Sequence, residues 1–396
     1  MTQAKSTRKK IVLKPKNYLC FLVIALALAI FAVLYYTGAL RRSQARMLHQ
    51  IAYSIILAAS LNLIVGYLGE LSLGHAGFMF VGAYVGCLAG NAMSATLPPL
   101  LSLIFSLFVG GAAAAVCGLI VGLPALRLKG DYLAIVTLAF GEIVRSVLSS
   151  EPLQGIFGGP LGLSVNTYGN SLFIVSFVVL LAVLFLLQNF IRSKHGRAIT
   201  AIRDSEIAAR ACGINVTFYK LAVFVIAAFF AGVAGVLYGH GTTPVLPSEF
   251  SYNYSIQILV MVVLGGLGSF NGAIVAAALL TFVDVRLQVA LPGRLSALRD
   301  IIYALILVSI VIVNNAPALK KFRDKFNFRT LGTFFLSLFA KIFRRKRDAE
   351  SAEAEIVDHP ADWSEIPTKI EMNEMLSLEP RREEENERDE GPGEEG

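Results

Sequence analysis

Ionisable side chains within or beside apolar runs are the first residues of this sequence that could do chemistry. Glu70, Glu142 and Asp284 stand in such positions, and His75 follows Glu70 closely. A charge near the centre of a bilayer costs at least about 2.5–3.5 kcal/mol, so residues of this kind often line a path for a solute or an ion. Glu142 and Arg145 could pair on one helix face, and each acid could instead lie near a membrane interface. No series of carboxylates and histidines suits a proton relay, which weakens the case for a proton-driven carrier.

Motifs for nucleotide binding or covalent catalysis do not occur in the sequence. It contains no GxxxxGK[ST] phosphate loop, no HExxH metal motif and no GxSxG nucleophile motif. Cys20, Cys87, Cys117 and Cys212 form no CxxC pair, and the five histidines show no ligand spacing. We therefore expect no catalytic residue, no metal site and no cofactor bound by this chain. If the chain serves a pump, a separate ATPase has to supply the energy.

A charged segment at residues 192–220 interrupts the apolar sequence, and its periodicity predicts a helix. Mostly small side chains recur on one face at spacings of three and four, at Ala198, Ala201, Ile202, Ser205, Ala208, Ala209 and Cys212. Glu206 and Arg210 stand four apart, a pair worth about 0.2–0.5 kcal/mol. Gly213 is placed to end the helix in the left-handed conformation. The small-residue face could fit a cleft on a partner protein, or the segment could simply lie over its own chain.

Composition indicates the elements that carry these residues. Of the 396 residues, 55% are hydrophobic and 16% are charged. The apolar residues form continuous runs near the ~20 residues that a helix needs to cross about 30 Å of hydrocarbon, without the alternation of a membrane barrel. The sequence therefore predicts an all-α integral membrane protein.

About ten membrane helices are expected, with a range of eight to ten. The predicted spans are residues 18–40, 47–67, 72–89, 100–123, 132–148, 171–191, 221–238, 256–264, 273–289 and 301–313. Glycines are dense at 66–90 and again in the sequence GGLGSFNG at 265–272. They could let helices pack closely or permit a broken helix that lines a cavity.

Basic loops test the orientation of these spans. A basic N-terminus at 1–17 in the cytoplasm places the loops at 123–131 and 192–220 on the same side, in agreement with the excess of Lys and Arg in cytoplasmic loops. The Gly- and Pro-rich loops at 150–170 and 239–255 then lie outside. One loop disagrees, because Arg41, Arg42 and Arg46 would also lie outside.

The sequence changes character after the last predicted span, and we divide it into four parts. Residues 1–17 form the basic N-terminus, 18–315 the transmembrane domain, 316–347 a basic amphipathic juxtamembrane segment and 348–396 an acidic tail. The tail carries 18 acidic and 4 basic residues, although the whole chain has a net charge of +7. It lacks the apolar content of a core and is predicted to be disordered.

Four long motifs carry a resemblance to a known family. They are LNLIVGYLGELSLGHAGFMFVGAY at 61–84, LRLKGDYLAIVTLAFGEIVRSVL at 126–148, GRAITAIRDSEIAARACGIN at 196–215 and SIQILVMVVLGGLGSFNGAIVAAALLTF at 255–282. With these motifs the chain resembles the M-type permease subunits of bacterial ABC importers for branched-chain amino acids. The resemblance covers roughly residues 20–315 and does not extend to the tail.

The resemblance implies a fold similar to that of type II ABC importers and a set of partners. It implies a second, related permease subunit, two ATPase subunits that bind ATP and Mg, and a periplasmic solute-binding protein. The chain is then expected in the lipid of a bacterial inner membrane, with both termini cytoplasmic and no nucleic-acid partner. Closely similar permeases serve urea, short amides or other amino acids. An ATP-independent secondary carrier or channel, or a scaffold whose acidic tail recruits partners, is the alternative of another class.

The resemblance also implies roles for particular residues. The segment at 192–220 resembles the coupling helix that docks on the ATPase, with candidates Arg197, Ala201, Ile202, Arg203, Glu206, Ala208, Ala209 and Gly213. The candidates for the translocation path are Asn62, Gly74, His75, Glu142, Gly266 and Gly268. For the glycines, close helix packing is the alternative role.

Overall fold

The computed structural model describes residues 19–37, 41–125, 130–150, 152, 154–165, 172–290 and five positions between 301 and 308. The chain divides into two units, Met1–Leu319 and Lys320–Gly396, and all described residues belong to the first. The predicted N-terminus at 1–17, the juxtamembrane segment at 316–347 and the acidic tail at 348–396 lie outside the described residues. So does most of the tenth predicted span.

Nine long helices make up most of the described chain. They are α1 Leu19–Tyr36, α2 Arg42–Asn62, α3 His75–Met93, α4 Pro99–Ala125, α5 Asp131–Leu148, α7 Leu172–Arg192, α10 Val216–Gly241, α11 Tyr252–Gly265 and α12 Phe270–Ala290. Shorter helices are α6 Gln154–Phe157, α8 Lys194–Asp204 and α9 Glu206–Ala211. A π-helix, Leu63–Leu68, continues α2, and 3-10 turns form at Gly159–Leu161 and Pro247–Phe250. The predicted all-α class is confirmed for these residues.

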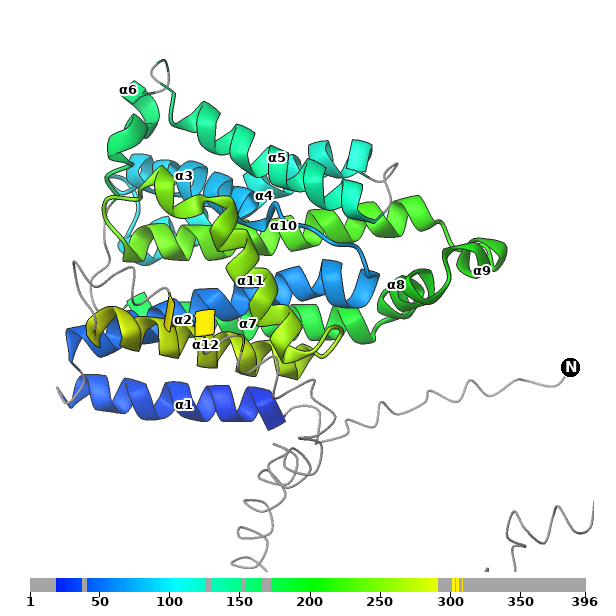
Figure 1. Ribbon diagram of the computed structural model, residues 1–396. Coiled ribbons are helices and arrows are strands. Elements are labelled where there is room, and N and C mark those ends of the chain that lie inside the picture. Colours follow the sequence, from blue (N-terminus) through cyan, green and yellow to red (C-terminus); the bar gives the residue numbers. More distant parts are fainter. Residues whose placement is uncertain are drawn as a thin grey trace, which may run out of the picture. The chain divides into compact units, whose positions relative to one another are not determined.

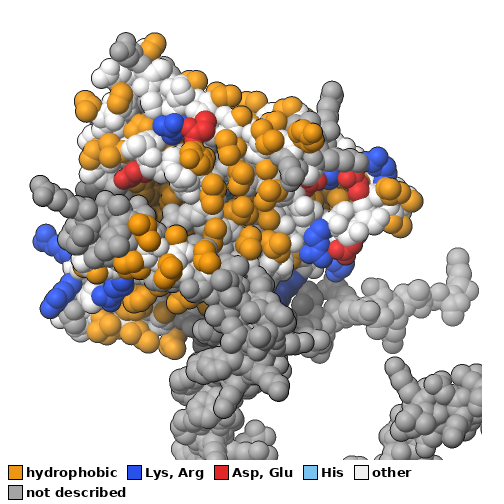
Figure 2. All heavy atoms as spheres, viewed as in Figure 1, with side chains coloured by type: hydrophobic (Ala, Val, Ile, Leu, Met, Phe, Trp, Pro, Cys, Tyr) orange, Lys and Arg blue, Asp and Glu red, His pale blue; other side chains and the backbone are white. Residues whose placement is uncertain are grey.

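Six of the long helices are long and apolar enough to cross a membrane, by length and composition. Many of their large apolar side chains point outward, among them Phe108 at 67% exposure and Ile120 at 62%. Figure 2 shows hydrophobic side chains over the middle of one face of the bundle and charged side chains mainly toward its two ends. This distribution is the one expected of a bundle surrounded by lipid.

Successive long helices run in alternating directions, which sorts the connections to two ends of the bundle (Figure 1). The helices α8 and α9 lie at one end, together with the π-helix and the turn between α11 and α12. The two Gly- and Pro-rich loops lie at the opposite end and meet there, since Leu163 N donates to Val245 O at 3.1 Å and Val245 N to Leu163 O at 3.0 Å. Arg41 and Arg42 also lie at this opposite end, where α2 begins.

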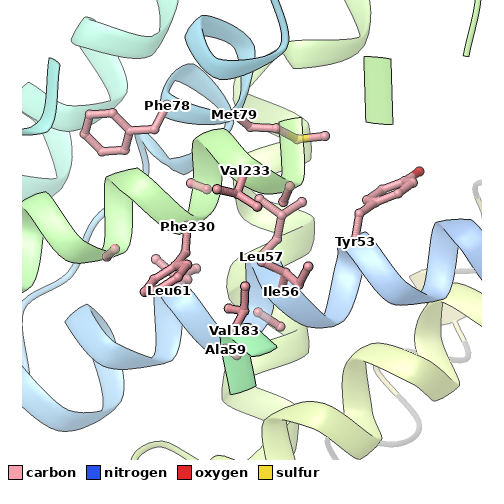
Figure 3. Close-up of a cluster of buried hydrophobic side chains, with 14 of the residues drawn as sticks. Tyr53, Ile56, Leu57, Ala59, Leu61, Phe78, Met79, Val183, Phe230 and Val233 are labelled. Carbon is pink, nitrogen blue, oxygen red and sulfur yellow. The ribbon is translucent and has the colours of Figure 1, made fainter. Parts of the chain in front are cut away.

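The helix α10 lies at the centre of the packing, against α3 and α4. Gly82 of α3 and Gly232 of α10 allow this approach, because a Cβ on Gly82 would overlap the Gly232 backbone. The helices α2, α3, α7 and α10 contribute buried side chains to one core cluster (Figure 3). Leu57, Met79 and Val233 are each at most 5% exposed in this cluster.

Several helix boundaries differ from the predicted ones because local capping moves them. The second span was predicted from 47, but α2 begins at Arg42, where the Arg41 N–H donates to Gln44 Oε1 at 2.9 Å. The seventh span was predicted from 221, but α10 begins at Val216 because the Asn215 side chain accepts from the Phe218 N–H at 3.1 Å. Lys220 therefore lies within the first turns of a membrane helix and not in a loop.

Candidate functional site

The charged segment folds as two helices, so the predicted single helix is wrong. Ser205 has φ −160° and ψ 107°, which is extended backbone, and its side chain accepts from the Ala208 N–H at 3.3 Å. Ser193 starts α8 in the same manner, accepting from the His195 N–H at 3.1 Å. A serine oxygen that caps a new helix competes with continuation of the preceding one, and this competition breaks the segment at Ser205.

The end of the segment agrees with the prediction. Gly213 has φ +80°, the left-handed conformation that an L side chain adopts only with strain. Its N–H donates to Arg210 O at 3.0 Å, and the Ile214 N–H reaches back to Ala209 O at 3.1 Å. This pair of bonds is the Schellman arrangement, and it fixes the angle at which the chain leaves α9 for α10.

The continuous small-residue face is also wrong, because the break turns α9 relative to α8. Ile202 and Ala209 are each 4% exposed and pack against this chain's own core. Ile207 is 85% exposed, and Ala208 beside it is exposed as well. The outward apolar surface of α9 is therefore Ile207 with Ala208, while Ala209 anchors the helix from behind.

A charge network attaches this segment to the bundle. Lys220 Nζ lies 2.6 Å from Glu70 Oε1 and 3.1 Å from Glu206 Oε2, and its side chain is 8% exposed. The predicted pair of Glu206 with Arg210 is confirmed at 2.7 Å. Lys220 thus joins α9 to the segment that follows the π-helix, and its ion pairs offset the burial of its own charge. Periodicity could not show this link, because Glu70 and Lys220 are distant in sequence.

A second link runs from α8 to the π-helix. Arg203 Nη1 donates to Gly66 O at 3.1 Å, while its other nitrogens hold Asp204 Oδ1 at 2.9 and 3.1 Å. Gly66 lies within the π-helix Leu63–Leu68, where the backbone departs from the α-helical ladder. The guanidinium of Arg203 therefore links α8 to the π-helix that continues α2.

The same π-helix contacts the turn between α11 and α12. Asn62 Nδ2 donates to Ser269 O at 3.2 Å, and the Gly268 N–H donates to Asn62 Oδ1 at 3.3 Å. Gly268 has φ +75°, so the turn requires glycine, and a Cβ on Gly66 would overlap the Gly268 N–H. We call Asn62, Gly66, Arg203 and Gly268 the junction. It brings together residues from three of the four sequence motifs.

Of the remaining predicted path residues, Gly266 has φ +91° in the turn after α11, and three others hold helices together. His75 is fully buried, and its Nε2 lies 2.8 Å from Ser60 Oγ of α2. Gly74 approaches the Thr137 carbonyl so closely that a Cβ would overlap it. Glu142 pairs with Arg145 at 2.6 Å, as predicted, and its other oxygen accepts from the Tyr252 N–H at 3.1 Å. Glu142 therefore fixes the start of α11. A path-lining role for these residues stays a prediction.

A cavity of about 840 Å³ lies among α2, α3, α10, α11 and α12, toward the end opposite α8 and α9. Its polar lining includes Gln50, Tyr53, Glu249, Gln257 and Asp284. None of the six predicted path residues lines it, but Asp284, an ionisable residue of the span predicted at 273–289, does. For two of the lining residues the sequence gives a weak indication, because Gln50 and Tyr53 are polar and stand three apart within an apolar helix.

Known proteins share sequence similarity with this chain. A sequence model of the family described as "branched-chain amino acid transport system / permease component" matches residues 43–311. The high-affinity branched-chain amino acid transport system permease protein LivM of Salmonella typhimurium strain LT2 is 37% identical over 259 residues, which cover 57% of this chain and 59% of LivM. LivM of Escherichia coli strain K12 gives the same identity and coverage.

A more distant relative extends the comparison. The ribose import permease protein RbsC of Escherichia coli strain K12 is 26% identical over 293 residues, covering 68% of this chain and 84% of RbsC. The chain spans about three fifths of the length of the LivM proteins that it matches. Its apolar helices and the family match agree in describing a multi-pass membrane protein. Because the match covers more than half of the chain, this protein belongs to the family of permease components of branched-chain amino acid transport systems.

Proposed function

We propose that this chain is the membrane-embedded permease subunit of an ATP-driven importer for branched-chain amino acids. The observation that carries the proposal is the construction of α8 and α9, a helix pair at one end of the bundle with an exposed apolar surface. In this proposal ATP and Mg bind to separate ATPase subunits. The relative RbsC is named an import permease, which supports the direction of transport.

The surface of α9 suits a protein partner. Ile207 is the most exposed large apolar side chain among the described residues, at 85%. Exposure of an apolar side chain to water is unfavourable, and a surface of this kind often marks a protein contact. Burial of such a side chain in a partner's groove contributes about 1.5–3 kcal/mol. Arg197, Arg203 and Arg210 are exposed nearby, so the partner's rim is expected to be acidic or polar.

The contacts behind this surface provide a route for mechanical coupling. A displacement of α9 acts on Lys220 through Glu206, and so on α10 and the segment at Glu70. A displacement of α8 acts through Arg203 on the π-helix, and from there on the α11–α12 turn at Gly268. Both routes start at the proposed ATPase contact and end on helices that line the cavity. Motion at one end can in this way alter access at the other.

The positions of the other partners depend on which side of the membrane each end of the bundle faces. We place α8 and α9 in the cytoplasm and both termini with them, in an inner membrane. The paired loops at Leu163 and Val245 then face a periplasmic solute-binding protein. A second, related permease subunit completes the translocation path. The division into a basic N-terminus, a transmembrane domain, a juxtamembrane segment and an acidic tail belongs to the same proposal.

Purification of the tagged full-length chain in mild detergent tests the proposal. We expect ATPase subunits, a second permease and leucine-stimulated ATP hydrolysis in the recovered complex. Ile207→Asp should lose the ATPase subunits while the second permease remains, and Thr217→Asp, which alters an exposed residue of α10, should keep both. Recovery of a lone chain that moves leucine, urea or a short amide without nucleotide would contradict the proposal and favour an ATP-independent carrier or channel.

A further inference from the structure

The cavity at the end opposite α8 and α9 has one wall of unusual charge. Glu249 and Asp284 both line it, and its lining contains no Lys or Arg among the described residues. Asp284 is held in place by Gln288, whose Nε2 donates to Asp284 Oδ2 at 2.9 Å. Glu249 has no ion-pair partner in the described part of the chain. Two carboxylates facing one partly enclosed space create a potential that favours a cation.

Aromatic rings form the neighbouring wall. Tyr53 and Tyr238 meet edge to face with centroids 5.5 Å apart, and Tyr238 meets Phe250 at 5.3 Å. Tyr53 is 5% exposed and lines the same cavity as Tyr254 and both carboxylates. Aromatic faces attract ammonium groups, and the attraction is stronger where water is excluded.

Asp284 has a polar neighbour on its own helix, α12. Thr281 stands one turn before Asp284 on the same side of the helix, and it is 2% exposed. Its hydroxyl has no hydrogen-bond partner among the described residues. A buried hydroxyl without a partner is uncommon, although Thr281 is not among the residues that line the cavity.

The rest of the lining suits the other parts of an amino acid. Met79, Phe250 and Val260 offer an apolar surface to a branched side chain, and the side-chain amides of Gln50 and Gln257 can donate to a carboxylate. The volume of about 840 Å³ is within the usual range of small-molecule sites. Glu142, the acid at the start of α11, is committed to Arg145 and the Tyr252 N–H and does not line the cavity.

We infer that this cavity is a solute site in which Glu249 and Asp284 bind the ammonium group of a free amino acid. The inference rests on the proposed function and deepens it, because it assigns part of the choice of substrate to the permease itself. A neutral solute such as urea or a short amide can form hydrogen bonds there but gains none of the charge attraction. The site therefore selects primary amines with an apolar tail over neutral amides and over acids.

Calorimetric titration of the purified wild-type complex with three probes tests this site. The probes are leucine, 3-methylbutan-1-amine, which lacks the carboxylate, and 4-methylpentanoate, which lacks the amine. We expect leucine and the amine to bind competitively and the acid to bind at least about tenfold more weakly. Equal binding of the acid and the amine would overturn the inference, and this comparison needs no variant that must fold.

Variants locate the site. Asp284→Asn and Glu249→Gln should each weaken binding of leucine and of the amine about tenfold, without weakening binding of the acid. Asp204→Asn is the charge-matched control and should leave all three affinities unchanged, since Asp204 is exposed on α8 and does not line the cavity. Unchanged affinities in both cavity variants would overturn the inference.

ATP-driven uptake of leucine by the same wild-type complex separates the two claims. If the complex takes up leucine but the cavity variants bind the probes as the wild type does, the proposed function is supported and the solute site is contradicted. Amine-selective binding at Glu249 and Asp284 without ATP-driven uptake supports the site and contradicts the proposed function.

Discussion

The ammonium group of Lys220 lies 2.6 Å from the carboxylate of Glu70, which joins the start of α10 to the segment that follows the π-helix. Glu206 of α9 shares the same ammonium at 3.1 Å. One ammonium group thus holds both α9 and the segment at Glu70. Movement of either one relative to α10 has to displace or break its contact with Lys220. The position of Lys220 makes it the point at which α9 and the bundle are most directly connected.

Loss of this cation is expected to destabilise the fold. Lys220→Met leaves Glu70, at 14% exposure, without its compensating charge. Removal of one partner of a fully buried pair costs about 3–5 kcal/mol, and we expect roughly 2 kcal/mol here because Glu206 is partly exposed to solvent. The thermal midpoint of the purified complex measures the effect. Adding Glu70→Gln and Glu206→Gln should restore part of the lost stability, and Lys194→Met, at an exposed position, should not change the midpoint.

Substitutions at two adjacent alanines of α9 distinguish docking from folding. Ala208 is exposed, so Ala208→Trp should leave expression and the thermal midpoint unchanged but reduce leucine-stimulated ATP hydrolysis at least about tenfold. Ala209 is buried, so Ala209→Trp should lower the midpoint through overpacking. Undiminished coupling in the Ala208→Trp complex would mean that α9 merely covers its own chain.

The bond between Arg203 and Gly66 is expected to carry coupling and little stability. Arg203→Ala removes the donor that reaches the π-helix at 3.1 Å. Because Arg203 is exposed to solvent, its ion pair with Asp204 contributes about 0–1 kcal/mol. We expect ATP hydrolysis to persist while leucine uptake per ATP falls, as measured in proteoliposomes. Asp204→Asn keeps the bond to Gly66 and should transport normally, and equal loss in both variants would argue against the junction.

The Glu249 carboxyl provides a test by pH. Although its side chain is exposed at the chain surface, partial burial of the carboxyl raises its pKa above the ordinary 4.5. A carboxyl whose pKa is higher in the folded chain stabilises the fold below its unfolded pKa, and this contribution is lost as pH rises through the folded value. Glu249→Gln should therefore raise the thermal midpoint of ligand-free protein at pH 7.5 and change it less at pH 4. The same difference at both pH values would show that Glu249 is not desolvated.

The features that the sequence predicted correctly are local ones. The apolar runs, the pair of Glu142 with Arg145 and the left-handed cap at Gly213 each depend on residues within about one helical turn or one continuous run. The break at Ser205 was missed because helical periodicity and serine capping made opposite predictions, and the cap formed.

The features that could not be predicted depend on residues distant in the chain. The pairing of Glu70 with Lys220 and the contact of Asn62 with Gly268 require the helices to be packed first. The cavity combines side chains of five long helices, and no helix contributes more than three polar residues, which look isolated in its own sequence. Helical periodicity places a residue on one face of its helix, but it does not show which other helix that face contacts.

Uptake of labelled leucine by proteoliposomes tests the central claim most directly. The vesicles contain the full-length chain with its second permease, with or without the ATPase subunits and ATP, and carry the solute-binding protein on the accessible side. We predict uptake only when the ATPase subunits and ATP are both present, and its loss in the Ile207→Asp complex. Equal uptake by the chain without ATPase subunits and without nucleotide would contradict the role of α8 and α9 as the coupling site.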